Sequence, residues 1–122
     1  MFAQGTRTHH HLEFAVASDA TDEALAAGLA RLRGPAVAAG GANVVIGLGP
    51  GPAQRLLPDD LPAGLRPFRS IEGLDGTAAP ATQRDLWIWI HGTGEDVVLD
   101  TARAAVAVVE GVASVAAEQP CF

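Results

Sequence analysis

The chain has 122 residues, a mass of 12.5 kDa and a hydrophobic content of 48%, which is enough for one compact domain with a closed core. Its net charge is −6 and its eight basic residues are all arginines that form no run, so nucleic-acid binding is not expected. No apolar stretch approaches the roughly 20 residues that cross a bilayer, and the N-terminus lacks a signal-peptide pattern. We therefore expect a cytoplasmic protein without membrane contact.

The N-terminal part predicts a strand with two different faces. Residues 1–9 are expected to form a flexible lead-in to a single domain over residues 10–122. Directly after the lead-in, apolar and other residues alternate with a period of two, which predicts a half-buried strand. The apolar set is Leu12, Phe14 and Val16, and the opposite set is His11, Glu13 and Ala15.

A helix and a buried strand are predicted next. Thr21 is followed by acidic residues and then by leucines at helical spacing, so the helix is expected to start near Thr21 and to end or kink at Gly34-Pro35. Residues 42–48 are rich in β-branched side chains and predict a second strand. The following Gly47–Gly51 segment resembles a phosphate loop only weakly, because Pro50 and Pro52 remove amide donors.

Residues 49–84 form a long loop with a short helix expected at 53–57. Long structureless connections in compact domains are usually lids, binding loops or flexible segments, so this loop is expected to have a purpose. Its Asp75-Gly76-Thr77 turn is not assigned a function.

The segment Asp85–Gly92 alternates two chemically distinct sets with a period of two. Leu86, Ile88 and Ile90 are expected to face a helix layer. The opposite set is large, amphipathic and partly titratable, and consists of Asp85, Trp87, Trp89 and His91. A second helix is predicted from Gly94-Glu95 to Gly111, followed by a weaker strand over residues 112–118.

The order β-α-β-loop-β-α-β predicts an α+β, ferredoxin-like fold (βαββαβ), with a four-stranded antiparallel sheet and two helices on one face. The other face must be covered by something. By analogy with small proteins of this shape, we expect a homodimer that packs sheet to sheet into a dimeric α+β barrel.

In this fold the first and third strands are central antiparallel neighbours, which places His11, Glu13 and Ala15 alongside His91, Trp89 and Trp87. Carboxylate and imidazole groups together allow acid/base chemistry near neutral pH, and indoles stack on flat ligands. The predicted catalytic residues are therefore Glu13, His91 and His11, and the predicted ligand-binding residues are Trp87, Trp89, Asn43 and Asp85. The same set is also typical of a dimer interface, and both readings stay open.

Metal binding and thiol chemistry are not expected. His9, His10 and His11 are consecutive, but adjacent strand residues point to opposite faces, so only His9 and His11 can converge, with His91 as a third ligand. The lone cysteine, Cys121, has no histidine near it in the sequence and is predicted to have no catalytic role.

Four segments of the chain form a recognisable combination: Val45–Pro50, Leu65-Arg66-Pro67-Phe68, Pro80–His91 and the helix from Ala102 to Val109. Together they resemble the N-terminal half of dye-decolourising (DyP-type) haem peroxidases, especially the bacterial forms. In that family two ferredoxin-like domains share one chain, and the second domain carries the haem. The family's proximal histidine, distal arginine and Gly-x-x-Asp-Gly motif would lie beyond residue 122, so none of those roles is transferred.

The resemblance, combined with the residues above, leads to two expected functions. The first is a haem-free, homodimeric DyP-like protein without cofactor or metal, which binds a small hydrophobic or aromatic molecule on the open sheet face, with isomerase- or cyclase-type acid/base catalysis as its chemistry. The alternative is an accessory N-terminal subunit of a split DyP-type peroxidase. In that case a separate haem-domain partner would supply the haem site.

Overall fold

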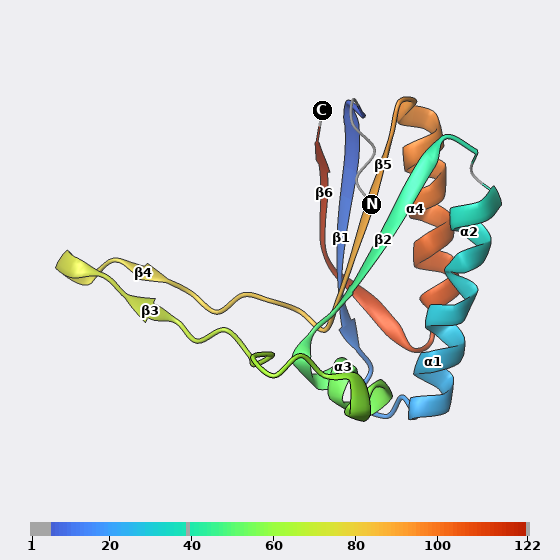
Figure 1. Ribbon diagram of the computed structural model, residues 1–122. Helices are drawn as coiled ribbons and strands as arrows, with labels where there is room; N and C mark the ends of the chain where they lie inside the picture. Colours follow the sequence, from blue (N-terminus) through green and yellow to red (C-terminus); the bar gives the residue numbers. More distant parts are fainter. Residues whose placement is uncertain (1–5, 39, 122) are drawn as a thin grey trace.

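The computed structural model describes residues 6–38 and 40–121 and contains a four-stranded antiparallel sheet. The strands are β1 (Thr8–Val16), β2 (Ala42–Leu48), β5 (Leu86–Gly92) and β6 (Ala113–Cys121), in the order β2-β5-β1-β6. The strands β1 and β5 are central neighbours, as the sequence predicts, and β2 and β6 form the two edges (Figure 1).

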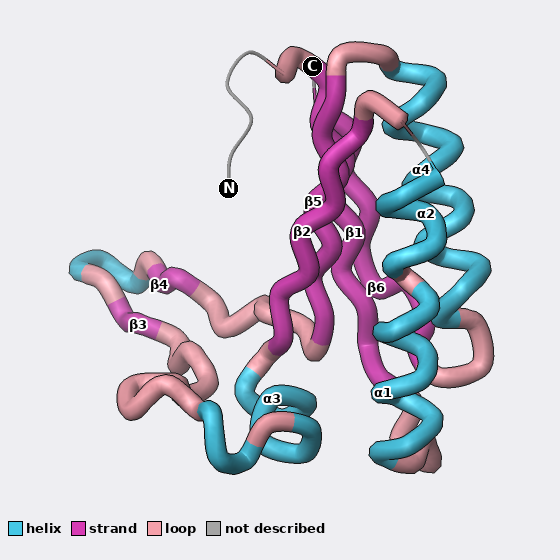
Figure 2. Tube along the Cα trace, turned by 45° about the vertical axis from the view of Figure 1, so that its right-hand side comes forward, coloured by secondary structure: helices cyan, strands magenta, loops and turns pink. Residues whose placement is uncertain are grey.

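Three helices cover one face of the sheet. They are α1 (Asp22–Arg31), α2 (Arg33–Ala38) and α4 (Glu95–Val109), and Figures 1 and 2 show them on the same side. A fourth helix, α3 (Pro50–Leu56), follows the end of β2. No helix of the described residues covers the opposite face, so the predicted α+β ferredoxin-like fold is confirmed, and that face is called the open face below.

The helix boundaries follow from local sequence. Thr21 caps α1, since its hydroxyl accepts a hydrogen bond of 3.2 Å from the Ala24 backbone N–H. The predicted interruption near Gly34-Pro35 lies between α1 and α2, where Pro35 falls in the first turn of α2 and therefore costs no helical hydrogen bond.

The core lies between the sheet and the helices. Its strand side chains are the apolar alternating sets of β1 and β5, and α4 contributes one face of small and β-branched residues. The completely or almost completely buried members are Leu12, Phe14, Leu25, Leu32, Leu86, Ile88, Ile90, Val98, Ala102, Ala105 and Val109.

The first and last strands of the chain, β1 and β6, are longer than the sequence indicates. β1 begins at Thr8, within the expected 1–9 lead-in, whose residues 1–5 lie outside the described part of the chain. β6 continues past Glu118 to Cys121, although Pro120 cannot donate a ladder hydrogen bond. An edge strand tolerates proline because one of its sides needs no partner.

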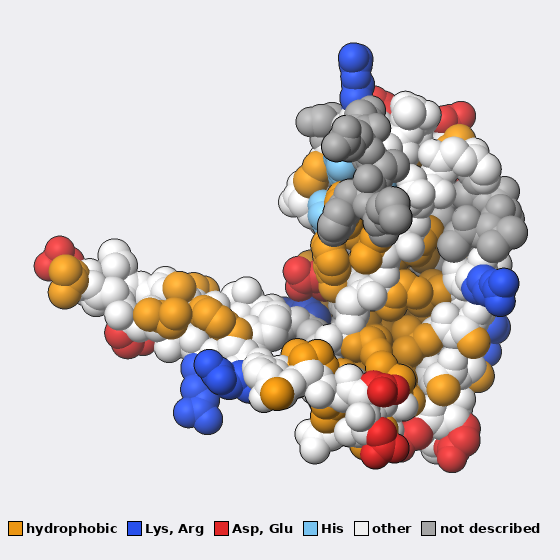
Figure 3. Space-filling model, in the orientation of Figure 1, with side chains coloured by type: hydrophobic (Ala, Val, Ile, Leu, Met, Phe, Trp, Pro, Cys, Tyr) orange, Lys and Arg blue, Asp and Glu red, His pale blue; other side chains and the backbone are white. Residues whose placement is uncertain are grey.

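Residues 62–84 form an extended arm that leaves the body of the domain (Figures 1 and 3). Every residue of the arm is exposed, and its two halves pair through the short strands β3 (Ile71–Glu72) and β4 (Ala78–Ala79). Short 3-10 turns lie at Pro58–Asp60, before the arm, and at Leu74–Gly76, where Asp75 and Gly76 have positive φ angles. None of the described helices has the length and apolar character needed to cross a membrane.

The pair Ile46 and Ile88 tests how the helix layer stabilises the sheet. They are cross-strand partners on the same face, yet Ile88 is 0% exposed and Ile46 is 40% exposed at the edge of the sheet. We predict that Ile88→Ala lowers the free energy of unfolding by about 2–5 kcal/mol because it leaves a cavity. Urea denaturation should show a clearly smaller loss for Ile46→Ala, and equal losses would contradict the assigned core.

Candidate functional site

Five aromatic rings form a continuous stack on the open face along the seam of β1 and β5. We call this stack the ring ladder; its members, in spatial order, are His91, His9, Trp89, His11 and Trp87. Neighbouring ring centroids lie 5.7–6.0 Å apart, with Trp89 and His91 closer at 4.4 Å, and the planes are inclined by 7–28°. Offset-stacked pairs at such distances contribute about 0.5–1.5 kcal/mol each beyond area burial.

The register of β1 and β5 produces the ladder. His9 pairs with His91, His11 with Trp89, and Glu13 with Trp87. This pairing is offset by two residues from the alignment expected from the sequence, in which His11 faces His91. The predicted open-face set is nevertheless brought together, and His9 is a member that the sequence reasoning placed only as a metal ligand.

Hydrogen bonds fix His9 within the ladder. The Trp89 indole N–H donates to His9 Nδ1 at 3.1 Å, and His9 Nε2 lies 3.3 Å from the backbone oxygen of Thr6. His9 therefore accepts at Nδ1 from the indole and donates at Nε2 to the backbone oxygen. Two hydrogen bonds and stacking against Trp89 and His91 thus fix the position of the His9 ring within the ladder.

His91 is the most deeply buried member of the ladder, at 1% exposure. Its Nδ1 lies 3.1 Å from the Thr6 hydroxyl, and its Nε2 has no hydrogen-bond partner among the described residues. The alternation pattern assigned His91 to the correct face but could not show that Thr6, which precedes the first strand, would reach it.

Burial changes the titration of two ladder histidines. Desolvation lowers the pKa of His11, with smaller contributions from His9 and His10 in the same direction and an opposing one from Glu13. Desolvation also lowers the pKa of His91, and His9 adds to it. Both imidazoles are therefore biased towards the neutral form, which can act as a base.

A cavity of about 420 Å³ lies at the Trp87 end of the ladder. Its polar lining comes from Glu13 on β1 and from Gln83 and Arg84 at the base of the arm, and Trp87 supplies an aromatic wall. Gly47 makes room for the indole, since a Cβ at position 47 would lie 3.2 Å from Trp87 Cε3. The sequence indicated Glu13 and Trp87 but not Gln83 or Arg84, because a long loop carries no periodic signal.

The two remaining predicted ligand-binding residues lie outside this cavity. Asp85 accepts a hydrogen bond of 2.9 Å from the Val16 backbone N–H, which ties the start of β5 to the end of β1. Asn43 is exposed on β2 and pairs with His91 at the far end of the ladder. A role for either residue in ligand binding stays a prediction.

A family comparison decides what kind of domain this is. The profile of the Dyp-type peroxidase N-terminal family matches residues 6–122. The chain belongs to this family. No curated protein sequence matches it.

Solved DyP-type peroxidases share the fold. The cryo-EM structure of the encapsulated DyP-type peroxidase from Mycobacterium smegmatis aligns with a TM-score of 0.87 at 25% identity, over 98% of this chain and 40% of that one. DyPB from Rhodococcus jostii RHA1 gives 0.84 at 24% identity, over 95% and 39%. A dye-decolorizing peroxidase from Bacteroides thetaiotaomicron gives 0.77 at 19% identity, over 98% and 41%. This DyP-type domain thus spans about two fifths of the length of these peroxidases.

The histidines of this DyP-type domain do not fit the axial position of a haem. Both nitrogens of His9 are hydrogen-bonded, His91 is buried, and His11 is stacked between two indoles. The fourth, His10, is 5% exposed on the helix side of the sheet, and its Nε2 contacts Glu118. The cavity beside Trp87 contains no histidine. The described residues also contain no cluster of three or more His, Cys, Asp or Glu placed to hold a metal ion.

We predict that Gly47→Ala disturbs the Trp87 end of the ladder. The added methyl group would meet the indole at 3.2 Å, so the ring must move away from β2. Near-UV circular dichroism and tryptophan emission should change, whereas Gly51→Ala, where a Cβ meets no atom within 4 Å, should leave both unchanged. An unaltered spectrum for Gly47→Ala would contradict the assigned packing.

The lowered histidine pKa values predict a pH dependence of stability. Because the unfolded chain binds protons at the ordinary histidine pKa of 6.5 and the folded chain binds them only at lower pH, stability is full above pH 6.5 and falls on acidification. The urea midpoint should decrease from pH 7.5 to pH 5.5. The double variant His11→Gln/His91→Gln should show a flatter profile, and an equally steep one would reject these two groups as the cause.

Proposed function

We propose that this domain is the N-terminal half of a DyP-type haem peroxidase and that its open face packs against the half that holds the haem. That second half is either a separate polypeptide or a continuation of the same one. The domain contributes a rigid aromatic wall, and the haem and its ligands come from the partner half.

The open face supports this proposal most directly. It has no helix cover among the described residues, yet it displays Trp87 at 37% exposure at the end of an ordered ring ladder. Exposed aromatic side chains that are already fixed in place lose little conformational entropy on binding, which is typical of interface anchors.

The family comparison supports it independently. The chain matches the N-terminal part of the family and spans about two fifths of the solved peroxidases, and its histidines are hydrogen-bonded, buried or stacked. Variants of the Rhodococcus protein have been solved in complex with heme, and this chain covers 40% of their length.

The proposal predicts a haem-containing complex that depends on Trp87. When a tagged form is purified from its source cells, a Soret absorption and a haem-binding second half should accompany it. Trp87→Glu places a charge in the interface and should abolish both. Leu74→Ser at the tip of the arm, where Leu74 is 87% exposed, is the matched control and should retain them.

Two results would contradict the proposal: a stable complex-free protein without Soret absorption, or a haem complex that survives Trp87→Glu. Circular dichroism of the variant should first show that the domain remains folded.

A second candidate function is favoured by the cavity beside Trp87. Glu13, Arg84 and Gln83 converge there next to an indole, an arrangement suited to a small aromatic acid whose ring stacks on Trp87 and whose carboxylate faces Arg84. In this reading the domain is a haem-free homodimer joined through its open face, and Glu13 is the acid/base group beside the ligand, whereas the predicted His11 and His91 lie further along the ladder and outside the cavity.

This candidate predicts ligand binding without any partner. 1-Naphthoate should quench the tryptophan emission of a dimer verified by sedimentation, and Arg84→Gln should weaken binding about tenfold through loss of a charged hydrogen bond. Arg103→Gln, on the helix face, should have no effect. A monomer whose emission does not respond to 1-naphthoate would remove this candidate.

A further inference from the structure

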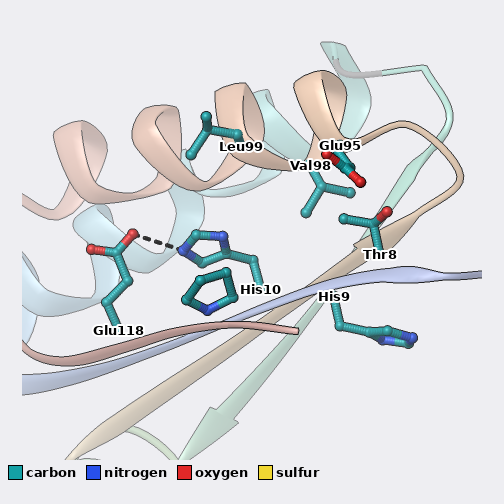
Figure 4. A pocket seen from close by; sticks show the side chains of 8 residues that line it. Thr8, His9, His10, Glu95, Val98, Leu99 and Glu118 are labelled. Atoms are coloured by element: carbon teal, nitrogen blue, oxygen red, sulfur yellow. Dashed lines mark hydrogen bonds and ion pairs between the residues drawn. The ribbon is translucent and has the colours of Figure 1, made fainter. Parts of the chain in front are cut away.

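A groove lies on the helix side of the sheet, opposite to the ring ladder, and shares His9 with it. It lies where α4 passes over β1 and the edge strand β6, and its main cavity measures about 530 Å³ (Figure 4). The cavity is lined by Thr8, His9, His10, Glu95, Val98, Leu99, Glu118 and Pro120. This volume is within the range of small-molecule sites in proteins.

His10 is the buried polar group of the groove, at 5% exposure. Its Nε2 contacts Glu118 Oε1 at 2.7 Å, the distance of a charge-assisted hydrogen bond. In this contact the Nε2–H of His10 donates to the carboxylate oxygen of Glu118, and Nδ1 is the other nitrogen of the ring. Figure 4 shows that Nδ1 is directed towards α4 and the cavity, whereas His9 points away to the other side of the sheet.

The charge of the groove is negative. Glu95, at the start of α4, and Glu118 both line the cavity, and the arginines of the chain do not. Only His10 lies between them, and it already interacts with one of the two carboxylates. Such a lining favours a cation with N–H groups to donate to carboxylate oxygens and to the imidazole.

The groove continues along α4 as an apolar channel. A neighbouring cavity of about 400 Å³ shares Leu99 and Glu118 with the first one. Its remaining lining is Ala102, Arg103 and Val106 from α4 and Val115 from β6, so it is apolar apart from Arg103, whose side chain is 73% exposed and lies 3.8 Å from Asp100. Leu99 and Val115 are 38% and 40% exposed. The groove therefore joins a cavity lined by two glutamates to a mainly apolar one with an exposed arginine at its rim.

We propose that this groove binds a small organic amine with an unbranched apolar tail. The ammonium group lies between Glu95, Glu118 and His10 Nδ1, and the tail runs along Leu99 towards Val115. The site stands on the opposite side of the sheet from the ring ladder, and it does not depend on the function proposed for the open face.

Hexylamine is the probe for this site. Isothermal titration should detect its binding to the complete chain, whereas 1-hexanol, which has the same tail but no charge, should not bind measurably. Propylamine should bind at least about tenfold more weakly than hexylamine, because it lacks three methylenes of buried tail.

Glutamine variants of the two glutamates test the contribution of their charge to binding while keeping the shape of the side chain. Glu118→Gln keeps an oxygen to accept the His10 hydrogen bond but removes the charge, and Glu95→Gln does the same at the other side. Each should weaken hexylamine binding about tenfold. Glu110→Gln, at the C-terminal end of α4 and outside both cavities, is the matched control and should bind as the unaltered chain does.

The indole of Trp87 reports the location of binding. The Trp89 indole N–H donates to His9, which is part of the groove lining, whereas Trp87 lies on the open face and away from the groove. The Trp87 indole N–H signal in a ¹⁵N–¹H spectrum should therefore stay fixed while the backbone signals of Thr8, His10 and Leu99 shift. Binding of 1-hexanol as tight as that of hexylamine, unchanged affinity in both glutamine variants, or shifts confined to the indoles would each overturn the proposal.

Discussion

The alternation of side chains along β1 and β5 is the constraint on which the rest of the structure depends. Because successive residues point to opposite faces, the same two strands supply side chains both to the core under the helices and to the open face. Leu12 and Ile88 pack in the core, and His11 and Trp89 lie on the open face. A shift of one residue in either strand would expose the aliphatic set and bury the imidazoles, so the core fixes the ladder's register.

This constraint explains how much of the fold and site the sequence reveals. Period-two alternation and the 3.6-residue spacing of α4 indicate the helix-covered face and the membership of Trp87, Trp89 and His91 in the open face. The central position of β1 and β5 follows from the usual strand order of the ferredoxin-like fold, and not from periodicity. The ends were not predictable. β6 reaches Cys121 because it pairs with β1 at a sheet edge, and Gln119 and Pro120 have no apolar pattern to indicate that.

Contacts between segments that are distant in the sequence were also not predictable from it. Glu118 meets His10 only because the register of β1 and β6 shifts at a bulge beside Glu13, and no local rule sets that position. Arg84 reaches the Trp87 cavity from the base of the arm, whose course is set by a few long-range hydrogen bonds, such as that from Gln83 to the Phe68 carbonyl. Such residues are found from geometry, since their own sequence neighbourhood is uninformative.

The three consecutive histidines show how one short segment can serve both faces. His9 and His11 are members of the ring ladder on the open face, and His10, which lies between them in the sequence, points to the opposite face and into the groove under α4. Their spacing thus rules out one shared site for all three and requires two separate environments. One environment is aromatic and lies on the open face, whereas the other is acidic and lies between the sheet and α4. A ligand at His10 could influence the open face only through the backbone of β1, where each residue of one face adjoins a residue of the other.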